Sequence, residues 1–255
     1  MGMLKISLPD SLSHEYASGT TVGEIVRNAY GKKSGAVAAL VDGEERDFSY
    51  VLEQDCDIEP ILGDTEAGRY ILRHSCAHLL AQAVVEIYPD AQPTIGPPIE
   101  NGFYYDFKMD PVGDGDLKKI EKKMQEHIRA NHTLTREEHD NRTLRDMFAG
   151  NPFKIEIMND KIGVDIGSSA YRQGDFVDLC LGPHVPSTSY LRWFKLTGTS
   201  QAYWKGDSSK ESLVRIYGMC FSSKDELRER ERQIEEAKKR DHKKIGKEME
   251  LYMID

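Results

Sequence analysis

The spacing of apolar residues divides the first sixty positions into short strands around one short helix. "LKISL" and "DIEPIL" alternate apolar and polar residues, and "AVAALVDGEERDFSYVL" predicts two strands joined at Asp42-Gly43. "TVGEIVRNAY" instead places apolar residues at helical spacing, with Thr20 or Thr21 as N-cap and Gly31 as its end. Strands and a helix in this order predict a small β-grasp, ubiquitin-like domain.

A second pattern predicts one long helix from about Glu66 to Ile87, containing "RHSCAHLL". One face of this helix is an apolar stripe, and the opposite face carries His74 and His78 among further apolar residues. A helix that is apolar on two faces is sandwiched between other elements, so both histidines should point into protein or into a pocket. Two interpretations remain open for them: a packed, hydrogen-bonded pair, or part of a site.

The rest of the chain mixes strands and helices. "NGFYYDF", "NPFKIEIM" and "SLVRIYGMCF" are predicted strands, while "DLKKIEKKMQEHIRANH" is a charged amphipathic helix. "YRQGDFVDLCLGPHVP" begins as a strand and becomes a loop at Gly182-Pro183, and a long, very polar helix ends the chain. We therefore predict an α+β class: a β-grasp domain over 1–63, a larger α/β domain over 64–223, and a linker helix over 224–255.

Composition narrows the setting. The 255 residues (28.9 kDa) include no apolar run long enough to span a membrane and no basic, then apolar, leader, which predicts a cytoplasmic protein. The four cysteines have no paired spacing, which favours reduced thiols. A net charge of −9 does not indicate nucleic-acid binding, although basic residues outnumber acidic ones over 224–247.

Candidate chemistry comes from two pairs of residues with the same spacing. His74-x-x-x-His78 on the helix and Cys180-x-x-x-His184 in the Gly-Pro loop could converge as a His₃Cys tetrad, a ligand set that suits tetrahedral zinc. Metal is not required, because imidazoles can also transfer protons or orient water alone. A nucleophilic Cys180 is disfavoured, since its loop offers no helix N-terminus to lower the thiol pKa.

Other residues could join such a tetrad if the fold brings them to it. Asp178 lies two residues before Cys180 on an alternating strand and could orient an imidazole or bind an ammonium group. Lys154 would be an ordinary surface lysine unless the fold brings it to the tetrad. Tyr104 and Tyr105 alternate, so only one of them can face a pocket.

Five stretches together resemble a known family. "RHSCAHLLAQAV", "PTIGPPIENGFYYDF", "YRQGDFVDLCLGPHVPSTSYL", "FKLTGTSQAYWKGDSSKESLVRIYG" and "EEAKKRDHKKIGKEMELY" resemble the N-terminal half of bacterial-type threonyl-tRNA synthetase. The first sixty residues look like the TGS domain of that family, although "LPDS" lacks the glycine usual after Pro-Asp. The resemblance covers nearly the whole chain.

The resemblance implies an editing domain that hydrolyses seryl-tRNA formed in error on threonine tRNA. By position, the four tetrad residues match the editing signature of the family, and Lys154, Asp178 and Tyr105 match residues around the same pocket. Threonyl members of the family work without metal there, so no cofactor is expected, whereas alanyl-type relatives bind zinc through the tetrad. The chain ends at "LYMID", about where the aminoacylation core of the family begins, so ATP and the zinc of that core belong to a part this sequence lacks. Whether the chain is an excised piece or a natural stand-alone editor is left open, and the full-length parent is expected to form homodimers through the absent domains.

The expected reaction is hydrolysis of the ester between serine and the terminal ribose. A synthetic pocket cannot strongly reject serine, because one missing methyl is worth only about 1–3 kcal/mol. His74 is the expected general base or ribose partner, Lys154 and the histidines hold the water, and His184 and Cys180 line the water side. Asp178 would bind the ammonium group, and Tyr105 would wall the pocket and place the terminal base. Two alternatives are a zinc hydrolase of the alanyl-editing type and a TGS-led RNA-binding module without catalysis.

Overall fold

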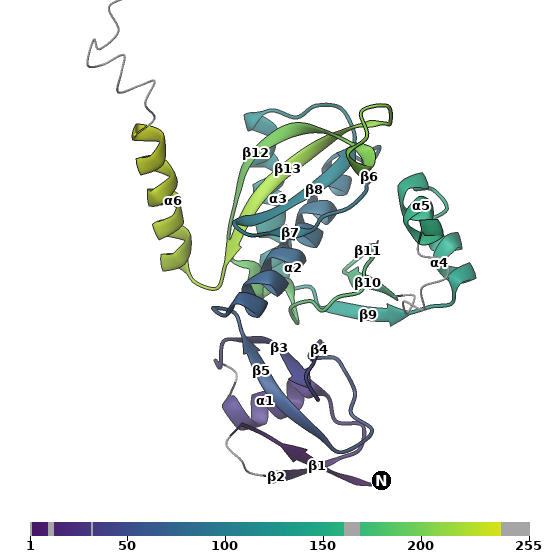
Figure 1. Cartoon of the computed structure of the whole chain (residues 1–255), viewed down its shortest axis with the longest axis vertical. Helices are drawn as coiled ribbons and strands as arrows, with labels where there is room; N and C mark the ends of the chain where they lie inside the picture. Colours follow the sequence, from purple (N-terminus) through teal and green to yellow (C-terminus); the bar gives the residue numbers. More distant parts are fainter. Residues whose placement is uncertain (1, 10–12, 32, 161–168, 241–255) are drawn as a thin grey trace, which may run out of the picture. The chain divides into compact units, whose positions relative to one another are not determined.

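The computed structural model describes residues 2–9, 13–31, 33–160 and 169–240. It divides into two compact units, Met1–Ser222 and Ser223–Asp255. The described residues mix helices with several sheets, as expected for an α+β protein (Figure 1). None of the described helices is long and apolar enough to cross a membrane.

The first sixty residues form a mixed sheet beside one helix. The sheet has the order β2-β1-β5-β3-β4, in which β1 and β5 are parallel and the other pairs antiparallel. Its strands are β1 (Met3–Ser7), β2 (Ser13–Ala17), β3 (Ala36–Val41), β4 (Glu44–Arg46) and β5 (Cys56–Leu62). The predicted strands are confirmed. The sequence did not predict β2.

Helix α1 (Val22–Tyr30) begins and ends where the sequence predicts. The Thr21 hydroxyl accepts a hydrogen bond from the Glu24 N–H, and the Glu24 carboxylate accepts one from the Thr21 N–H, which is a capping box. Its apolar face, with Val22, Ile25 and Val26, packs into a small core with the strands.

Helix α2 (Glu66–Ile87) has the predicted bounds and is buried on most sides. It packs with α3 (Asp114–Ala130) against an antiparallel sheet of order β12-β13-β8-β6, with β7 on the edge of β8 (Figure 1). That sheet contains β6 (Gln92–Pro93), β7 (Pro98–Ile99), β8 (Gly102–Lys108), β12 (Trp193–Tyr203) and β13 (Ser212–Phe221). Short 3₁₀ turns, η1 (Thr188–Leu191) and η2 (Trp204–Gly206), flank β12. The sandwiched position predicted for α2 is confirmed.

Another sheet, with three strands, has the order β11-β10-β9. The loop after β11 carries Cys180 and His184, two of the four residues of the predicted tetrad. The strands of this sheet are β9 (Leu134–Glu138), β10 (Ser169–Gln173) and β11 (Phe176–Leu179), and α4 (Asn141–Met147) and α5 (Pro152–Asp160) connect β9 to the undescribed segment 161–168. Only the β10–β11 region was foreseen.

The predicted strand "NPFKIEIM" is wrong, because these residues form α5. The Asn151 side chain accepts hydrogen bonds from the N–H groups of Phe153 and Lys154, and Pro152 occupies the first helical position. An N-cap followed by proline is a helix-start signal, and here it prevails over the alternating pattern of "KIEI".

In the second unit, α6 (Lys224–Lys239) begins where the polar C-terminal helix was predicted. Pairs such as Arg232 with Glu229 and Glu236 lie on one helix face. The part of the prediction over residues 241–255 falls outside the described residues.

Candidate active site

The structure brings the four tetrad residues together. Helix α2 supplies His74 and His78 one turn apart, and the loop after β11 supplies Cys180 and His184. The Cys180 Sγ lies 3.2 Å from Nε2 of His74 and 3.2 Å from Nε2 of His184. One ring nitrogen of each histidine and the sulfur all lie within 4.8 Å of one another. We refer to His74, His78, Cys180 and His184 as the tetrad.

Ser75 fixes the tautomer of His184. Its hydroxyl hydrogen is directed at the Ile71 carbonyl oxygen (2.8 Å), and its oxygen accepts from the Val185 N–H (3.1 Å). The 3.0 Å contact between Ser75 Oγ and His184 Nδ1 then requires Nδ1–H to donate, because a serine has only one hydroxyl hydrogen. Nε2 of His184 is therefore left with a lone pair facing the Cys180 thiol.

The loop that carries His184 is anchored by a residue from the first sixty positions. The Asp47 carboxylate accepts from the His184 backbone N–H (2.6 Å) and from the Tyr171 hydroxyl (2.5 Å). The Tyr171 hydroxyl also lies so close to Gly182 that a Cβ there would be 1.9 Å away, and Gly182 has φ +76°. The loop thus needs glycine at this point. Asp47 holds both the His184 backbone and the Tyr171 hydroxyl that packs against Gly182.

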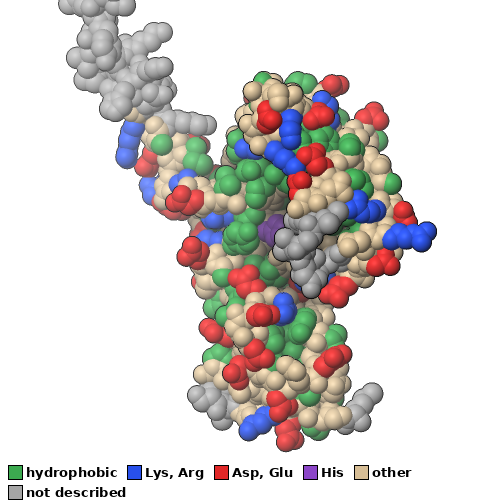
Figure 2. All heavy atoms as spheres, turned by 45° about the vertical axis from the view of Figure 1, so that its right-hand side comes forward, with side chains coloured by type: hydrophobic (Ala, Val, Ile, Leu, Met, Phe, Trp, Pro, Cys, Tyr) green, Lys and Arg blue, Asp and Glu red, His purple; other side chains and the backbone are tan. Residues whose placement is uncertain are grey.

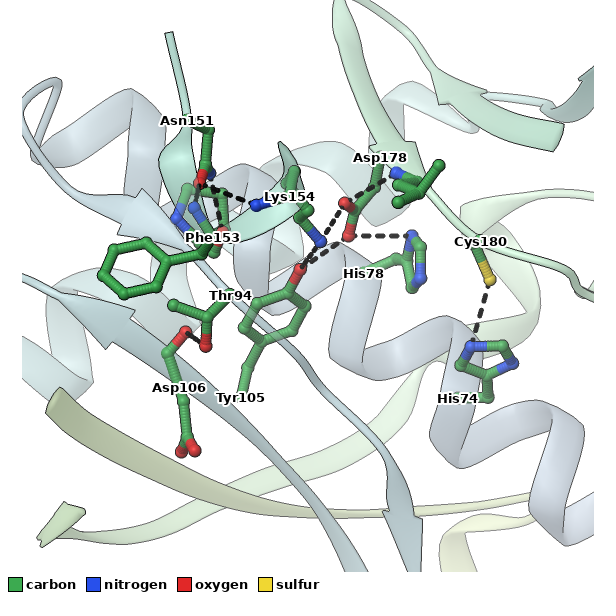
Figure 3. Close-up of polar contacts among 12 residues, drawn as sticks. His74, His78, Thr94, Tyr105, Asp106, Asn151, Phe153, Lys154, Asp178 and Cys180 are labelled. Atoms are coloured by element: carbon green, nitrogen blue, oxygen red, sulfur yellow. Dashed lines mark hydrogen bonds and ion pairs between the residues drawn. The ribbon is translucent and has the colours of Figure 1, made fainter. Parts of the chain in front are cut away.

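At the opposite end of the site lies a buried group of charged and polar side chains (Figure 3). Lys154 Nζ is 2.5 Å from Asp178 Oδ1 and donates to the Tyr105 hydroxyl (3.1 Å), which in turn donates to Asp178 Oδ2 (2.6 Å). His78 Nδ1 is 3.7 Å from the same Oδ2 and joins this group to the tetrad. Lys154, Asp178 and Tyr105 are each no more than 3% exposed.

We call Lys154, Asp178 and Tyr105 the charged end, and His74, Cys180 and His184 the thiol end. Helix α5 brings Lys154 into the site, and the Asn151 side chain ties the start of that helix to the Pro93 carbonyl of β6 (2.8 Å). Tyr105 points into the site, as one member of the Tyr104-Tyr105 pair must. Figure 3 shows Asp106 directed away from it on the same strand.

Burial keeps the histidines neutral. It lowers the pKa of His74 to about 3, with the nearby His78 adding to the effect, and lowers that of His78 to about 4. The pKa of His184 falls well below its ordinary value for the same reason. Burial raises the pKa of the Cys180 thiol to about 12. At neutral pH the site therefore holds three proton acceptors and a protonated thiol, which is a poor nucleophile.

Two buried carboxyls respond in opposite ways. Burial raises the pKa of Asp178, but the attraction of Lys154 and His78 and the hydrogen bonds from Lys154 and Tyr105 outweigh it, so the net pKa is lowered. The Asp47 pKa is raised, because burial outweighs the hydrogen bonds from His184 and Tyr171. The charged end is thus a true buried ion pair, whereas the thiol end is electrically neutral.

The donor set of the tetrad fits a zinc ion. Three imidazole nitrogens and one sulfur are ligands that zinc prefers, and zinc–ligand bonds of about 2.0–2.3 Å need these atoms within roughly 4 Å of one another. The sulfur already meets that spacing with two histidines, and the widest pair would close slightly. His184 Nδ1 is held by Ser75, and His78 Nδ1 lies 3.7 Å from Asp178, which are positions of the outer contacts that orient histidine ligands.

All seven residues singled out from the sequence thus lie in one site. Asp47, Ser75 and Tyr171 also shape it and were missed. Ser75 lies within the predicted helix directly after His74, and this position was a weak signal that it belongs to the site. Asp47 gave none, because its contact with His184 spans 137 positions.

The chain is similar to known proteins, both over part of this site and over nearly its whole length. Residues 169–217, which include Asp178, Cys180 and His184, match the threonyl and alanyl tRNA synthetase second additional domain. The chain is 44% identical over 261 residues to a threonine–tRNA ligase of Acetivibrio thermocellus, covering 99% of this chain and 40% of the relative. Threonine–tRNA ligases of Thermoplasma acidophilum (46% identity, 97% of this chain, 36% of the relative) and Bacillus subtilis (43%, 98% and 39%) are similar along the same length. The chain therefore spans about two-fifths of these relatives and is similar to threonine–tRNA ligases along nearly its whole length.

Proposed function

We propose that this chain removes serine from threonine tRNA by hydrolysing the ester between serine and the terminal ribose. The observation that carries the proposal is the junction of the neutral tetrad with the charged end through His78 and Asp178. One end suits an ammonium group, and the other offers unprotonated imidazoles to a water molecule. The proposed domains are a TGS-type β-grasp over 1–63, an editing domain over 64–223 and a linker helix over 224–255.

The charged end would recognise the amino group of the substrate. Asp178 already receives Lys154, Tyr105 and the Leu179 N–H (2.8 Å), so its oxygens have little room for another donor. We infer that the substrate ammonium displaces Lys154 from Oδ1. The released Lys154 Nζ then turns to the ester or to the attacking water.

The thiol end would handle the water. His74 is the proposed partner of the water, because it is the only histidine of the tetrad that is more than marginally exposed and because burial keeps its imidazole unprotonated. Neutral His74 takes a proton from the water as the oxygen attacks the ester carbonyl. The bond from the acyl carbon to the ribose oxygen breaks, and that oxygen takes a proton, which gives free serine and uncharged tRNA. Cys180 and His184 line the water side, and no acyl group is transferred to the thiol.

Selectivity against threonine would come from size. The synthetic site cannot strongly reject the smaller serine, whereas a second pocket too tight for one extra methyl group admits serine and excludes threonine. Tyr105 would form part of its wall. The natural partner is a threonine tRNA mischarged with serine, in the cytoplasm, and the full-length relative is proposed to be a homodimer.

The decisive test is a deacylation time course on seryl- and threonyl-charged threonine tRNA, with and without a chelator. We expect loss of serine only, at a rate that the chelator does not change. Loss of serine that stops with the chelator and returns with added zinc would instead support the zinc hydrolase, the alternative that the donor set of the tetrad favours. Equal rates with and without protein, together with tRNA binding, would support the non-catalytic module.

A further inference from the structure

The tetrad opens toward solvent on one side. Among its members, His78 and His184 are 5% and 1% exposed, whereas His74 and Cys180 are half-buried. Any substrate too large to be enclosed must therefore leave the site past His74 and Cys180. Figure 2 shows histidine atoms on one face of the molecule with apolar side chains beside them.

Three exposed apolar residues belong to segments that adjoin the tetrad. Tyr70 is 53% exposed, and its ring centroid lies 6.3 Å from that of His74. Leu181, 43% exposed, follows Cys180 directly, and Ile99, 41% exposed, is held near the helix by a hydrogen bond from Arg73 to its carbonyl oxygen. We call Tyr70, Ile99 and Leu181 the apolar rim.

The site needs a stacking surface that Tyr105 cannot supply. One side of the Tyr105 ring stacks on Phe107 (centroids 4.9 Å apart), Lys154 Nζ lies 5.7 Å from its centroid, and the residue is 1% exposed. An incoming base therefore has no free face there. Tyr70 is the only exposed tyrosine in the described part of the chain whose ring contacts a member of the tetrad.

We propose that Tyr70, with Leu181 and Ile99 on adjoining segments, is a stacking platform for an unpaired nucleobase at the 3′ end of the bound RNA. The inference rests on the proposed function, since an ester on the terminal ribose places that nucleoside within a few ångströms of the tetrad. Bases stack on exposed tyrosines without regard to sequence, because every base has a π-face. Tyr70 lies inside α2, whose first turn is capped by Thr65, so the platform is rigid.

The first experiment measures stacking without catalysis. A short RNA ending in CCA, with 2-aminopurine as its last base, is titrated with the full chain, and fluorescence quenching is followed. We expect quenching that Tyr70→Ala weakens about 10-fold in affinity and that Tyr70→Phe retains. Tyr203→Ala, which removes another exposed tyrosine on β12, is the matched control and should leave it unchanged. Equal quenching by the unchanged chain and Tyr70→Ala would overturn the proposal.

The second experiment separates this inference from the proposed function. If the unchanged chain hydrolyses seryl-tRNA, Tyr70→Ala should raise KM about 10-fold with little change in kcat, and an unchanged KM would overturn the platform. If the unchanged chain hydrolyses nothing, the proposed function fails, and the quenching titration alone decides the platform. Sedimentation tests whether a second copy of the chain occupies the apolar rim instead. If the chain forms a dimer that Tyr70→Ala dissociates, and quenching is not lost, the apolar rim is a self-association surface and the proposal is contradicted.

Discussion

The two ends of the site are built on different physical principles. At the charged end, Lys154 and Asp178 form a buried ion pair in which the two opposite charges balance each other. At the thiol end, His74, Cys180 and His184 carry no net charge at neutral pH, because burial lowers the histidine pKa values and raises that of the thiol. This difference is the basis of our proposal that one small site binds a cation at one end and keeps proton acceptors free at the other.

The ends also differ in what holds them. The charged end is fixed by α5 and β8 within the region after residue 64, whereas the His184 loop is anchored by Asp47 from the first sixty residues. Damage to the N-terminal sheet should therefore reach the thiol end first.

The largest effect is expected from breaking the ion pair on one side. Lys154→Met leaves Asp178 buried and unpaired, which should lower the free energy of unfolding by about 3–5 kcal/mol. It should also reduce seryl-tRNA hydrolysis at least about 100-fold, because the group that would polarise the ester or the water is lost. Urea unfolding and a deacylation assay measure both.

The double variant Lys154→Met with Asp178→Asn is the control for that experiment. It removes both charges and should recover most of the stability but none of the activity. Recovery of activity would show that the charges serve the fold alone, which contradicts the proposed recognition of the ammonium group.

At the thiol end we expect a large effect on rate but a smaller effect on stability. His74→Ala removes the proposed general base and should slow hydrolysis by about 10²–10⁴-fold in single-turnover assays. The side chain is half-buried and bears no charge, so unfolding should change by less than about 2 kcal/mol. A rate near that of the unchanged chain would remove His74 from its central role.

Asp47→Asn probes the support of the thiol end. The amide keeps one acceptor oxygen but cannot satisfy both the His184 N–H and the Tyr171 hydroxyl as well as the carboxylate does. We expect a loss of about 1–3 kcal/mol in unfolding free energy and roughly 10-fold in hydrolysis. Glu59→Gln, an exposed change on β5 of the same sheet, should alter neither. If both variants behave alike, the N-terminal sheet does not support the site.

The smallest effect is expected for Cys180→Ser. A thiol with a pKa of about 12 stays protonated and can only donate or accept hydrogen bonds, which a hydroxyl also does. Hydrolysis should fall only a few-fold in the deacylation assay. A loss of 10³-fold or more would indicate that the sulfur is a nucleophile or a metal ligand.

Local signals determined which features could be predicted. The bounds of α1 and α2 follow from caps and apolar spacing within a few residues, and both are as predicted. The tetrad was recognisable because two short spacings repeat. Strand alternation placed Asp178 beside Cys180, and a resemblance over nearly the whole chain singled out Lys154 and Tyr105. The error at 152–160 came from weighing the alternation in "KIEI" above the Asn151-Pro152 start signal.

Other features had no local signal. Strand β12 alternates poorly, since it reads "WFKLTGTSQAY" and its register shifts at a bulge between Leu196 and Gly198. Asp47 lies in a turn-rich acidic stretch that any surface loop could contain, and only the folded chain brings it to His184. Tyr70 reads as an ordinary helix residue until the exposure of the site around His74 is known.

The division between the two ends is tested most directly by a crystal structure of the chain with a seryl-adenosine whose ester is replaced by a stable amide. We expect the ammonium group on Asp178, Lys154 Nζ moved from Oδ1 toward the acyl group, and the acyl carbon within reach of a water on His74. An ammonium group bound away from Asp178, with the Lys154–Asp178 pair intact, would contradict it.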